Sequence, residues 1–249
     1  MNWALIGWGV IGFALVLLAA LQLWFKKRGG YQARHFPEID KLEEAQTIAI
    51  ERGLRRTVVL GHQLSSLGYP GLGLNSLAAL PGFLNQESLS YGKMSISASE
   101  GSLAVFARQI IENRYQDGFS DALIASKVKP VLLGPTPFSF SAGLLSDLGI
   151  YGEHGLVLTG HFGPEAALWS EICASKNGQV FAAAGTIDSQ ASLYTHVDSF
   201  LLGESSFFLP GMIHPSLGKQ AGWLAEDILR LVLILSILLG AILKMVGVL

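Results

Sequence analysis

Apolar residues are concentrated at the two ends of the chain. Residues 3–25 contain no charged side chain and are followed at once by Lys26, Lys27 and Arg28. At about 1.5 Å per helical residue, this stretch can cross a hydrocarbon layer of about 30 Å. A cleaved secretory signal is the alternative, but such a signal carries its basic residues before the apolar run. Because basic residues stay on the cytoplasmic side, the pattern predicts a first transmembrane helix that ends inside.

A second apolar run closes the sequence. Residues 231–249 contain one charged side chain, Lys244, and are preceded by a short charged segment. This pattern predicts a second transmembrane helix over residues 223–249, returning to the outside. Lys244 lies in its last third, where a long side chain can extend to the headgroups, and a functional intramembrane lysine is the alternative. Both chain ends are therefore expected outside the cell membrane and the middle of the chain in the cytoplasm.

Between the apolar runs, short β-branched segments alternate with amphipathic ones. Residues 57–61, TVVLG, are typical of a strand buried on both faces, whereas Leu42, Ala45 and Ile48 recur at helical spacing. Strands are expected at residues 57–60, 94–98, 130–133, 156–159, 180–184 and 200–202. Helices are expected at residues 40–52, 77–89 with a break near Pro81, 102–115, 139–148, 164–175 and 189–195.

This alternation defines the expected fold class. Strands that alternate with helices imply right-handed crossovers and therefore an α/β domain with a doubly wound, mostly parallel sheet of about six strands. The sheet domain is expected between one N-terminal and one C-terminal transmembrane helix. The expected order is a transmembrane helix with its basic flank at 1–28, a linker at 29–37, a cytoplasmic α/β domain at 38–210, a linker at 211–222 and a transmembrane helix at 223–249.

Composition agrees with a chain that meets two solvents. Half of the residues are apolar and 14% are charged, which is too apolar for an ordinary soluble domain and too polar for a transporter with many spans. Cys173 is the single cysteine, so no disulfide can form within the chain. No basic stripe with interleaved aromatic residues is present, which argues against a nucleic-acid partner. The expected partners are membrane lipid and either copies of the chain or another membrane protein.

The loops that follow the expected strands carry the candidate site. Ligands of open parallel sheets bind at the carboxyl ends of the strands, and here these loops combine glycine, hydroxyl groups, isolated acids and histidines. His62 and His161 follow two strands at corresponding positions, so they could face each other and bind a metal or move a proton. Histidines satisfied by backbone carbonyls are the alternative. The expected ligand-binding residues are His62, Glu100, Thr136, His161, Glu165, Thr186 and Asp188.

Several of these residues also have a purely structural interpretation. Glu165 suits the first turn of a helix, and Asp188 suits a helix N-cap. Gly71 and Gly73, with Glu100 further on, suggest a dinucleotide site, but the third glycine is missing and some ten residues separate this segment from its strand. Phosphate loops, nucleophile elbows and zinc-protease motifs are absent from the sequence. The sequence therefore assigns no catalytic residue, no metal ligand and no cofactor.

Four segments carry a resemblance to a known family: TGHFGPEAALWSE from Thr159, AAAGTIDSQASLY from Ala182, LLGESSFF from Leu201 and WLAEDILRLVLILSILLGAILK from Trp223. They resemble a family of uncharacterised prokaryotic two-span membrane proteins with a central α/β domain. The resemblance covers most of the chain and implies the same order of first span, α/β domain and last span. Gly203, Glu204 and Ser205 stand where the family has glycine and an acid pair, and the resemblance implies no activity.

Two functions are compatible with the sequence. The favoured one is a membrane-anchored, non-enzymatic structural or assembly component that oligomerises through its spans and its cytoplasmic domain. Ser236 and Gly240 form a small-xxx-small pair that allows helices to approach closely. Four phenylalanines lie in apolar segments, and half of them are expected in the core: Phe138, Phe140, Phe207 and Phe208. The alternative is a small-ligand-binding protein or enzyme with its site at the carboxyl ends of the strands.

Overall fold

The computed structural model describes these residues of the chain: 3–28, 36–62, 70–87, 93–115, 128–150 and 154–245. They divide into two units, each described by itself. Helices α1 (Trp3–Arg28) and α10 (Leu217–Met245) belong to the first unit. The second unit, His35–His214, is an α/β domain.

The α/β domain is built on a parallel sheet. Its strands, as far as the chain is described, are β1 (Arg55–Leu60), β2 (Lys93–Ala98), β3 (Pro130–Leu132), β4 (His154–Gly160), β5 (Gln179–Ala184) and β6 (Ser199–Leu202). They are hydrogen-bonded in the order β3-β2-β1-β4-β5-β6, and every pair is parallel. The prediction of a parallel α/β sheet of about six strands is confirmed, and each strand overlaps its predicted range.

The strand order places a reversal of the chain at the centre of the sheet. From β1 the chain moves outward to β2 and β3, then returns to β4 beside β1 and moves outward again to β5 and β6. In doubly wound sheets the point between the two central strands, where the chain changes direction, is the place where crossover helices diverge and ligands bind. The carboxyl ends of β1 and β4 are therefore the first place to look for a site.

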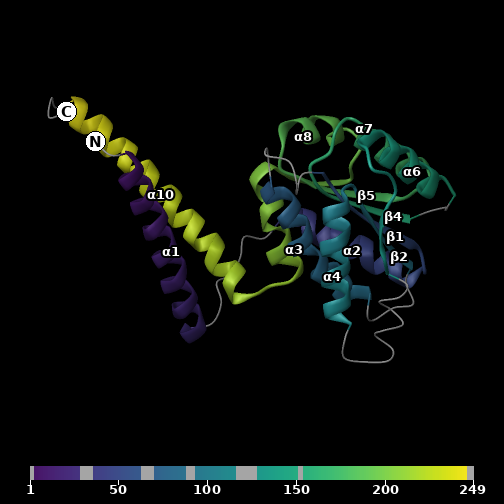
Figure 1. Ribbon diagram of the computed structural model, residues 1–249, viewed down its shortest axis with the longest axis horizontal. Coiled ribbons are helices and arrows are strands. Elements are labelled where there is room, and N and C mark those ends of the chain that lie inside the picture. Colours follow the sequence, from purple (N-terminus) through teal and green to yellow (C-terminus); the bar gives the residue numbers. More distant parts are fainter. Residues whose placement is uncertain are drawn as a thin grey trace. The chain divides into compact units, whose positions relative to one another are not determined.

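Helices cover both faces of the sheet (Figure 1). One face carries α2 (Pro37–Glu51), α3 (Pro70–Glu87), α4 (Gly101–Arg114) and α9 (Leu209–Ile213), which follows the 3-10 segment η1 (Gly203–Phe208). The other face carries α6 (Pro137–Ile150), α7 (Glu165–Ser175) and α8 (Ile187–Leu193). Side chains alternate between the two cores, with Val58 and Val157 in one and Val59 and Leu158 in the other. Burial on both faces explains why the strands are continuous apolar runs.

Helix α3 departs from its predicted form. It begins at Pro70 and continues through Pro81, so the predicted break is wrong. The helix is held on both sides, because Leu80 and Leu84 are buried in the core and Gly82 lies against Ile213 of α9. These contacts stabilise the helix across Pro81, where one backbone hydrogen bond is lost. The glycine-rich segment considered for a dinucleotide lies inside this helix, which removes the loop that such a site requires.

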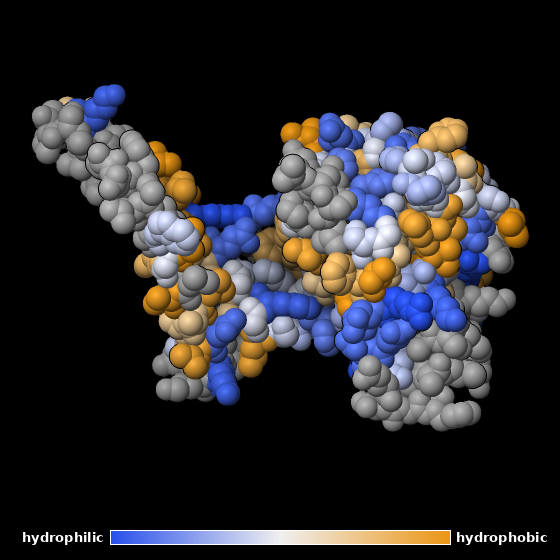
Figure 2. All heavy atoms as spheres, in the orientation of Figure 1, coloured by the Kyte–Doolittle hydropathy of each residue, from blue (hydrophilic) through white to orange (hydrophobic). Residues whose placement is uncertain are grey.

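The paired helices α1 and α10 pack against each other and run antiparallel, so the first and last described residues lie at the same end of the pair (Figure 1). Figure 2 shows apolar side chains on the part of this pair whose side chains are described. The large exposed ones include Trp8, Ile11, Phe13, Val16, Leu23, Leu231, Leu233, Leu235 and Ile237. Among the described residues, no helix has both the length and the apolar character of a membrane-crossing segment.

The boundaries of the units differ slightly from those expected. Helix α2 already begins at Pro37, the last residue of the expected first linker. Most of α9 and the first turns of α10 fall within residues 211–222, the range expected for the second linker. Apolar side chains account for this helical structure, since Leu209 of α9 is fully buried in the core of the α/β domain.

Candidate functional site

The carboxyl ends of β1 and β4 stay joined beyond the parallel ladder. The backbone N–H of Gly61 donates to the carbonyl of Thr159 at 2.8 Å, and that of His62 donates to the carbonyl of His161 at 2.9 Å. His62 and His161 form an isolated antiparallel bridge. The two histidines are therefore neighbours along the backbone at the switch point of the sheet.

Glycine is required on both sides of this bridge. A Cβ on Gly61 would lie 2.5 Å from the carbonyl oxygen of His161 and 2.7 Å from its nitrogen, which is closer than any real contact. Gly160 has a φ of +121°, which side-chain-bearing residues rarely adopt. The two glycines allow the backbones to approach, and the following residues, His62 and His161, are thereby placed next to each other.

His62 is a largely enclosed group of the site. Its side chain is 14% exposed, and its Nε2 lies 4.0 Å from Oε1 of Glu165. This buried Nε2 has no hydrogen-bond partner among the described residues. Burial lowers the pKa of His62, an effect larger than the opposing influence of the carboxylates of Glu165 and Glu100; the neighbouring His161 lowers it further. At neutral pH the imidazole is therefore uncharged.

A hydroxyl network holds His161. Its Nδ1 lies 2.7 Å from Oγ1 of Thr186 and 3.3 Å from Oγ of Ser189, and these two hydroxyl oxygens are 2.7 Å apart. The Ser189 hydroxyl is fully buried, accepts from the N–H of Phe162 at 2.8 Å and lies 2.7 Å from the carbonyl oxygen of that residue. The start of α8 thus fixes the loop after β4, and with it the orientation of the His161 ring.

Two carboxylates face the histidines. Oε1 of Glu165 accepts from the N–H of Gly163 at 3.1 Å, so the predicted role of this residue at the start of α7 is confirmed. The same oxygen is the one nearest His62, which gives it a second contact. Glu100 occupies the N-cap position of α4 and accepts from the Ser102 hydroxyl at 3.3 Å. Its negative charge raises the pKa of His62, an effect smaller than that of Glu165.

The structure brings together four of the seven predicted residues, His62, His161, Glu165 and Thr186, and the charge of a fifth, Glu100, acts on the pKa of His62. The hydroxyl of Thr136 instead stabilises the start of α6, where its Oγ1 accepts from the N–H of Ser139 at 3.2 Å. The N-cap position of α8 belongs to Thr186, and Asp188 is an exposed residue of the first helical turn. Both follow strands, but hydroxyl and carboxylate groups at such positions commonly stabilise the helix that begins there.

Two hydroxyl groups of the site were not predicted as ligand contacts. Ser99 follows β2, and its N–H donates to the carbonyl of Leu60, which places it beside the end of β1. Its side chain is 3% exposed, and its Oγ has no hydrogen-bond partner among the described residues. Thr159, at the end of β4, has a buried Oγ1 that also has no hydrogen-bond partner among the described residues. Buried polar atoms without partners are uncommon and mark places where a ligand or water completes the hydrogen bonding.

The donor set does not resemble a metal centre. No group of three or more histidine, cysteine, aspartate or glutamate side chains that could hold a metal occurs in the described part of the chain. What the site offers instead is an uncharged imidazole, two carboxylates and several hydroxyl groups. These groups recognise hydrogen-bond donors such as hydroxyl and ammonium groups.

Comparison with known proteins adds little to this geometry. No protein family and no curated protein matches the sequence. Among solved structures, the chain is similar to a "Putative sugar binding protein" from Salmonella typhimurium LT2, with a TM-score of 0.36 and 15% sequence identity. The match covers 91% of this chain and 50% of that protein, so the chain spans about half of its length. A similarity this low carries no argument about fold or function.

Proposed function

We propose that this chain is a membrane-anchored protein that binds a small polar ligand at the carboxyl ends of β1 and β4. The observation that carries the proposal is the buried Nε2 of His62, which lies 4.0 Å from Oε1 of Glu165 with no hydrogen-bond partner among the described residues. A ligand group seated here would contact the imidazole and the carboxylate together. Ser99, which lies beside the end of β1, has a second buried hydroxyl without a hydrogen-bond partner among the described residues.

The charges of the site indicate the kind of ligand. Glu100 and Glu165 accept hydrogen bonds and repel anions, while the uncharged His62 can donate or accept according to its tautomer. The ligand is therefore neutral or positively charged and carries hydroxyl or ammonium groups. An anionic phosphate or carboxylate ligand is disfavoured, because the negative charges of two carboxylates already act on His62.

The anchoring part of the proposal rests on α1 and α10. In α1, the charged residues are confined to the last turn, at Lys26, Lys27 and Arg28, and its described large apolar side chains are mostly exposed. Exposed apolar side chains on a paired helix favour contact with lipid or with another helix. The antiparallel pairing of α1 and α10 supports two chain ends on one side of the membrane, and the basic residues at the end of α1 support a cytoplasmic α/β domain.

A second candidate function is assembly into an oligomer. The exposed apolar residues of the helical pair support it, and so do Phe138 and Ile187 on the α/β domain, which are 85% and 81% exposed. Phe140 and Phe208, in contrast, are buried, so two of the four phenylalanines considered for assembly belong to the core. Assembly and ligand binding are compatible, and the mass of the gently solubilised protein separates a single copy from an oligomer.

Ligand binding is tested with the full chain in lipid nanodiscs and three probes: ethanolamine, glucose and acetate. We expect ethanolamine or glucose at millimolar concentration to raise the melting temperature and acetate to leave it unchanged. Glu165→Gln should weaken that binding about tenfold, because it removes the charge of the acceptor. The control is Glu51→Gln, an exposed change on α2. If no probe acts, or if acetate acts equally, the proposed ligand class is wrong.

Topology is tested separately with reporter fusions. A reporter inserted after Gly53 should be active only in the cytoplasm, and reporters at both chain ends should be active only outside. The basic cluster after the first apolar helix is the physical reason, since it resists translocation. An external reporter at Gly53 would contradict the orientation while leaving the ligand site unaffected.

A further inference from the structure

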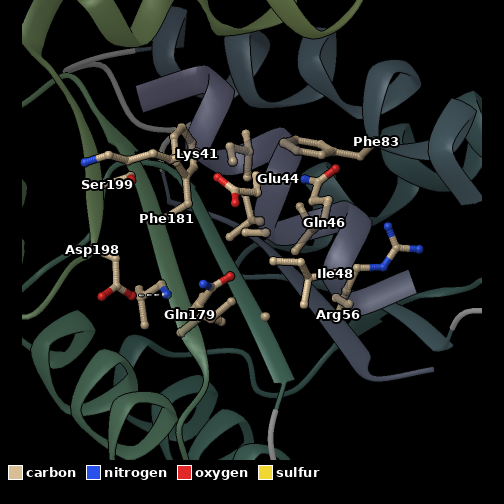
Figure 3. A pocket seen from close by; sticks show the side chains of 18 of the residues that line it. Lys41, Glu44, Gln46, Ile48, Arg56, Phe83, Gln179, Phe181, Asp198 and Ser199 are labelled. Atoms are coloured by element: carbon tan, nitrogen blue, oxygen red, sulfur yellow. Dashed lines mark hydrogen bonds between the residues drawn. The ribbon is translucent and has the colours of Figure 1, made fainter. Parts of the chain in front are cut away.

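A cavity of about 320 Å³ lies at the amino-terminal ends of the strands, beneath α2 and against β1, β4, β5 and β6 (Figure 3). Its apolar lining comes from α2 and from the sheet, with Ala45 and Ala49 on the helix and Val58 and Phe181 on the strands. Phe83 of α3 closes one side. The cavity therefore lies on the same face as α3 and α4, and at the other end of the strands from His62.

A buried amide lines this apolar space. Gln46, on α2, is 7% exposed, and its carboxamide oxygen has no hydrogen-bond partner among the described residues. Removing a carboxamide from water without a partner costs free energy, so native proteins rarely leave one in this state.

Charges of both signs stand around the cavity. Lys41 and Glu44 come from α2 and the buried Arg56 from β1, while Asp198 precedes β6 and accepts from the N–H of Val180 at 2.8 Å (Figure 3). Gln179, at the start of β5, adds an uncharged amide. Opposite charges at the margin favour neither an anion nor a cation, whereas the apolar lining favours a hydrophobic body.

We propose that this cavity is a second binding site, specific for a compact, uncharged amphipathic molecule. An aromatic or branched aliphatic body occupies the apolar space, and one amide or hydroxyl group pairs with the carboxamide of Gln46. The volume falls within the range of small-ligand sites, which begins at about 300 Å³. An apolar cavity of about 150 Å³ already suffices to bind benzene, so a substituted ring has room here.

Occupancy of this site acts on α2. The helix supplies Leu42, Ala45, Gln46 and Ala49 to the lining, so a bound molecule replaces open space beneath it with contacts. In the sequence, α2 is the first helix after α1. The site is independent of the polar site at the carboxyl ends, because the two sites share no residue.

The test uses the full chain in nanodiscs with 4-fluorobenzamide as the probe, and 19F NMR with empty nanodiscs as the blank. We expect saturable binding, because the probe combines a ring with an amide that can pair with Gln46. Ala49→Phe should abolish binding by filling the cavity, with the melting temperature unchanged or raised. If that variant does not fold, Ala45→Leu reduces the same space with a smaller side chain.

Two comparisons make the result decisive. Gln46→Leu keeps an apolar side chain of similar size and removes the amide, so it should weaken 4-fluorobenzamide binding about tenfold and leave binding of fluorobenzene nearly unchanged. Ala191→Phe adds the same ring at an exposed position of α8 and should leave binding of 4-fluorobenzamide unchanged. The inference is overturned if the intact chain shows no saturable binding, or if Ala49→Phe and Gln46→Leu bind the probe as tightly as the unmodified protein.

Discussion

At the scale of single residues, the candidate site depends on a position without a side chain, Gly61. The absence of a side chain at Gly61 lets β1 and β4 remain hydrogen-bonded past the end of the ladder. That contact turns His62 inward, where burial keeps its imidazole uncharged. The uncharged imidazole of His62 is therefore a consequence of the close packing of the β1 and β4 backbones.

Replacing Gly61 with alanine should lower the free energy of unfolding by about 1–3 kcal/mol, because the new Cβ forces two backbones apart. Gly101→Ala is the matched control, since a Cβ there meets nothing within 4 Å and alanine favours the helix. Denaturant unfolding of the two variants measures the difference. Equal stability of both would show that the strand ends can separate without cost.

Stability should also depend on pH through His62. Burial lowers its pKa from the ordinary value of 6.5, so the folded state takes up a proton less readily than the unfolded chain. The free energy of unfolding is then unaffected by this group above pH 6.5 and falls as the pH drops below it. His62→Gln removes this contribution. Between pH 7.5 and 5 the melting temperature of the unmodified protein should fall more steeply than that of His62→Gln, and equal slopes would contradict the assignment.

At the scale of elements, α7 joins the candidate site to the core. Trp169 is fully buried, and its ring meets those of Phe140 and Phe162 edge to face, at centroid distances of 5.7 and 5.8 Å. Phe140 also contacts the ring of His62 at 6.2 Å. The aromatic cluster thus supports the loop after β4 from below while the hydroxyl of Ser189 holds it from α8.

Trp169→Ala should cost about 3–5 kcal/mol of stability, because it empties the centre of this cluster. Leu168→Ala, one residue away on the exposed side of α7, should change stability by less than about 0.5 kcal/mol. Trp169→Phe should be milder than Trp169→Ala, since the buried indole N–H has no hydrogen-bond partner in the described residues to lose. Chemical unfolding of the three variants provides the ranking.

The elements also show what a sequence can predict. Strands such as β1 were predicted because β-branched residues in a parallel sheet are buried on both faces, and the two histidines followed from their equivalent positions after β1 and β4. Thr136 and Asp188 were assigned to the site because helix starts and ligand loops use the same residue types. The continuity of α3 and the cavity beneath α2 were not predictable, since both depend on contacts between segments distant in sequence.

At the scale of the whole molecule, the pairing of α1 with α10 can be tested directly. A Cβ on Gly218 would lie 3.8 Å from Nε2 of Gln22, so cysteines at these two positions should be joined by a short bismaleimide within one chain. Cys173 should not interfere, because burial, with a smaller contribution from Asp198, raises the pKa of its thiol to about 12. Mass spectrometry of the labelled protein detects the link.

The control pair places the second cysteine at Ser236 instead of Gly218. That position lies 18 residues further along the same helix, or roughly 27 Å at about 1.5 Å per residue, beyond the reach of the reagent. Equal cross-linking of both pairs, or links between two chains only, would show that α1 and α10 do not pair as described.

The ring of Phe36 stacks on that of Phe208, with centroids 5.8 Å apart. Phe36 stands just before α2, and Phe208 just before α9, the last helix of the α/β domain. The chain therefore enters and leaves this domain at nearby points, which is the arrangement of a module inserted into a host. A gene in which a short flexible linker replaces residues 36–214 should still encode a paired α1 and α10, and the excised module should fold when expressed alone.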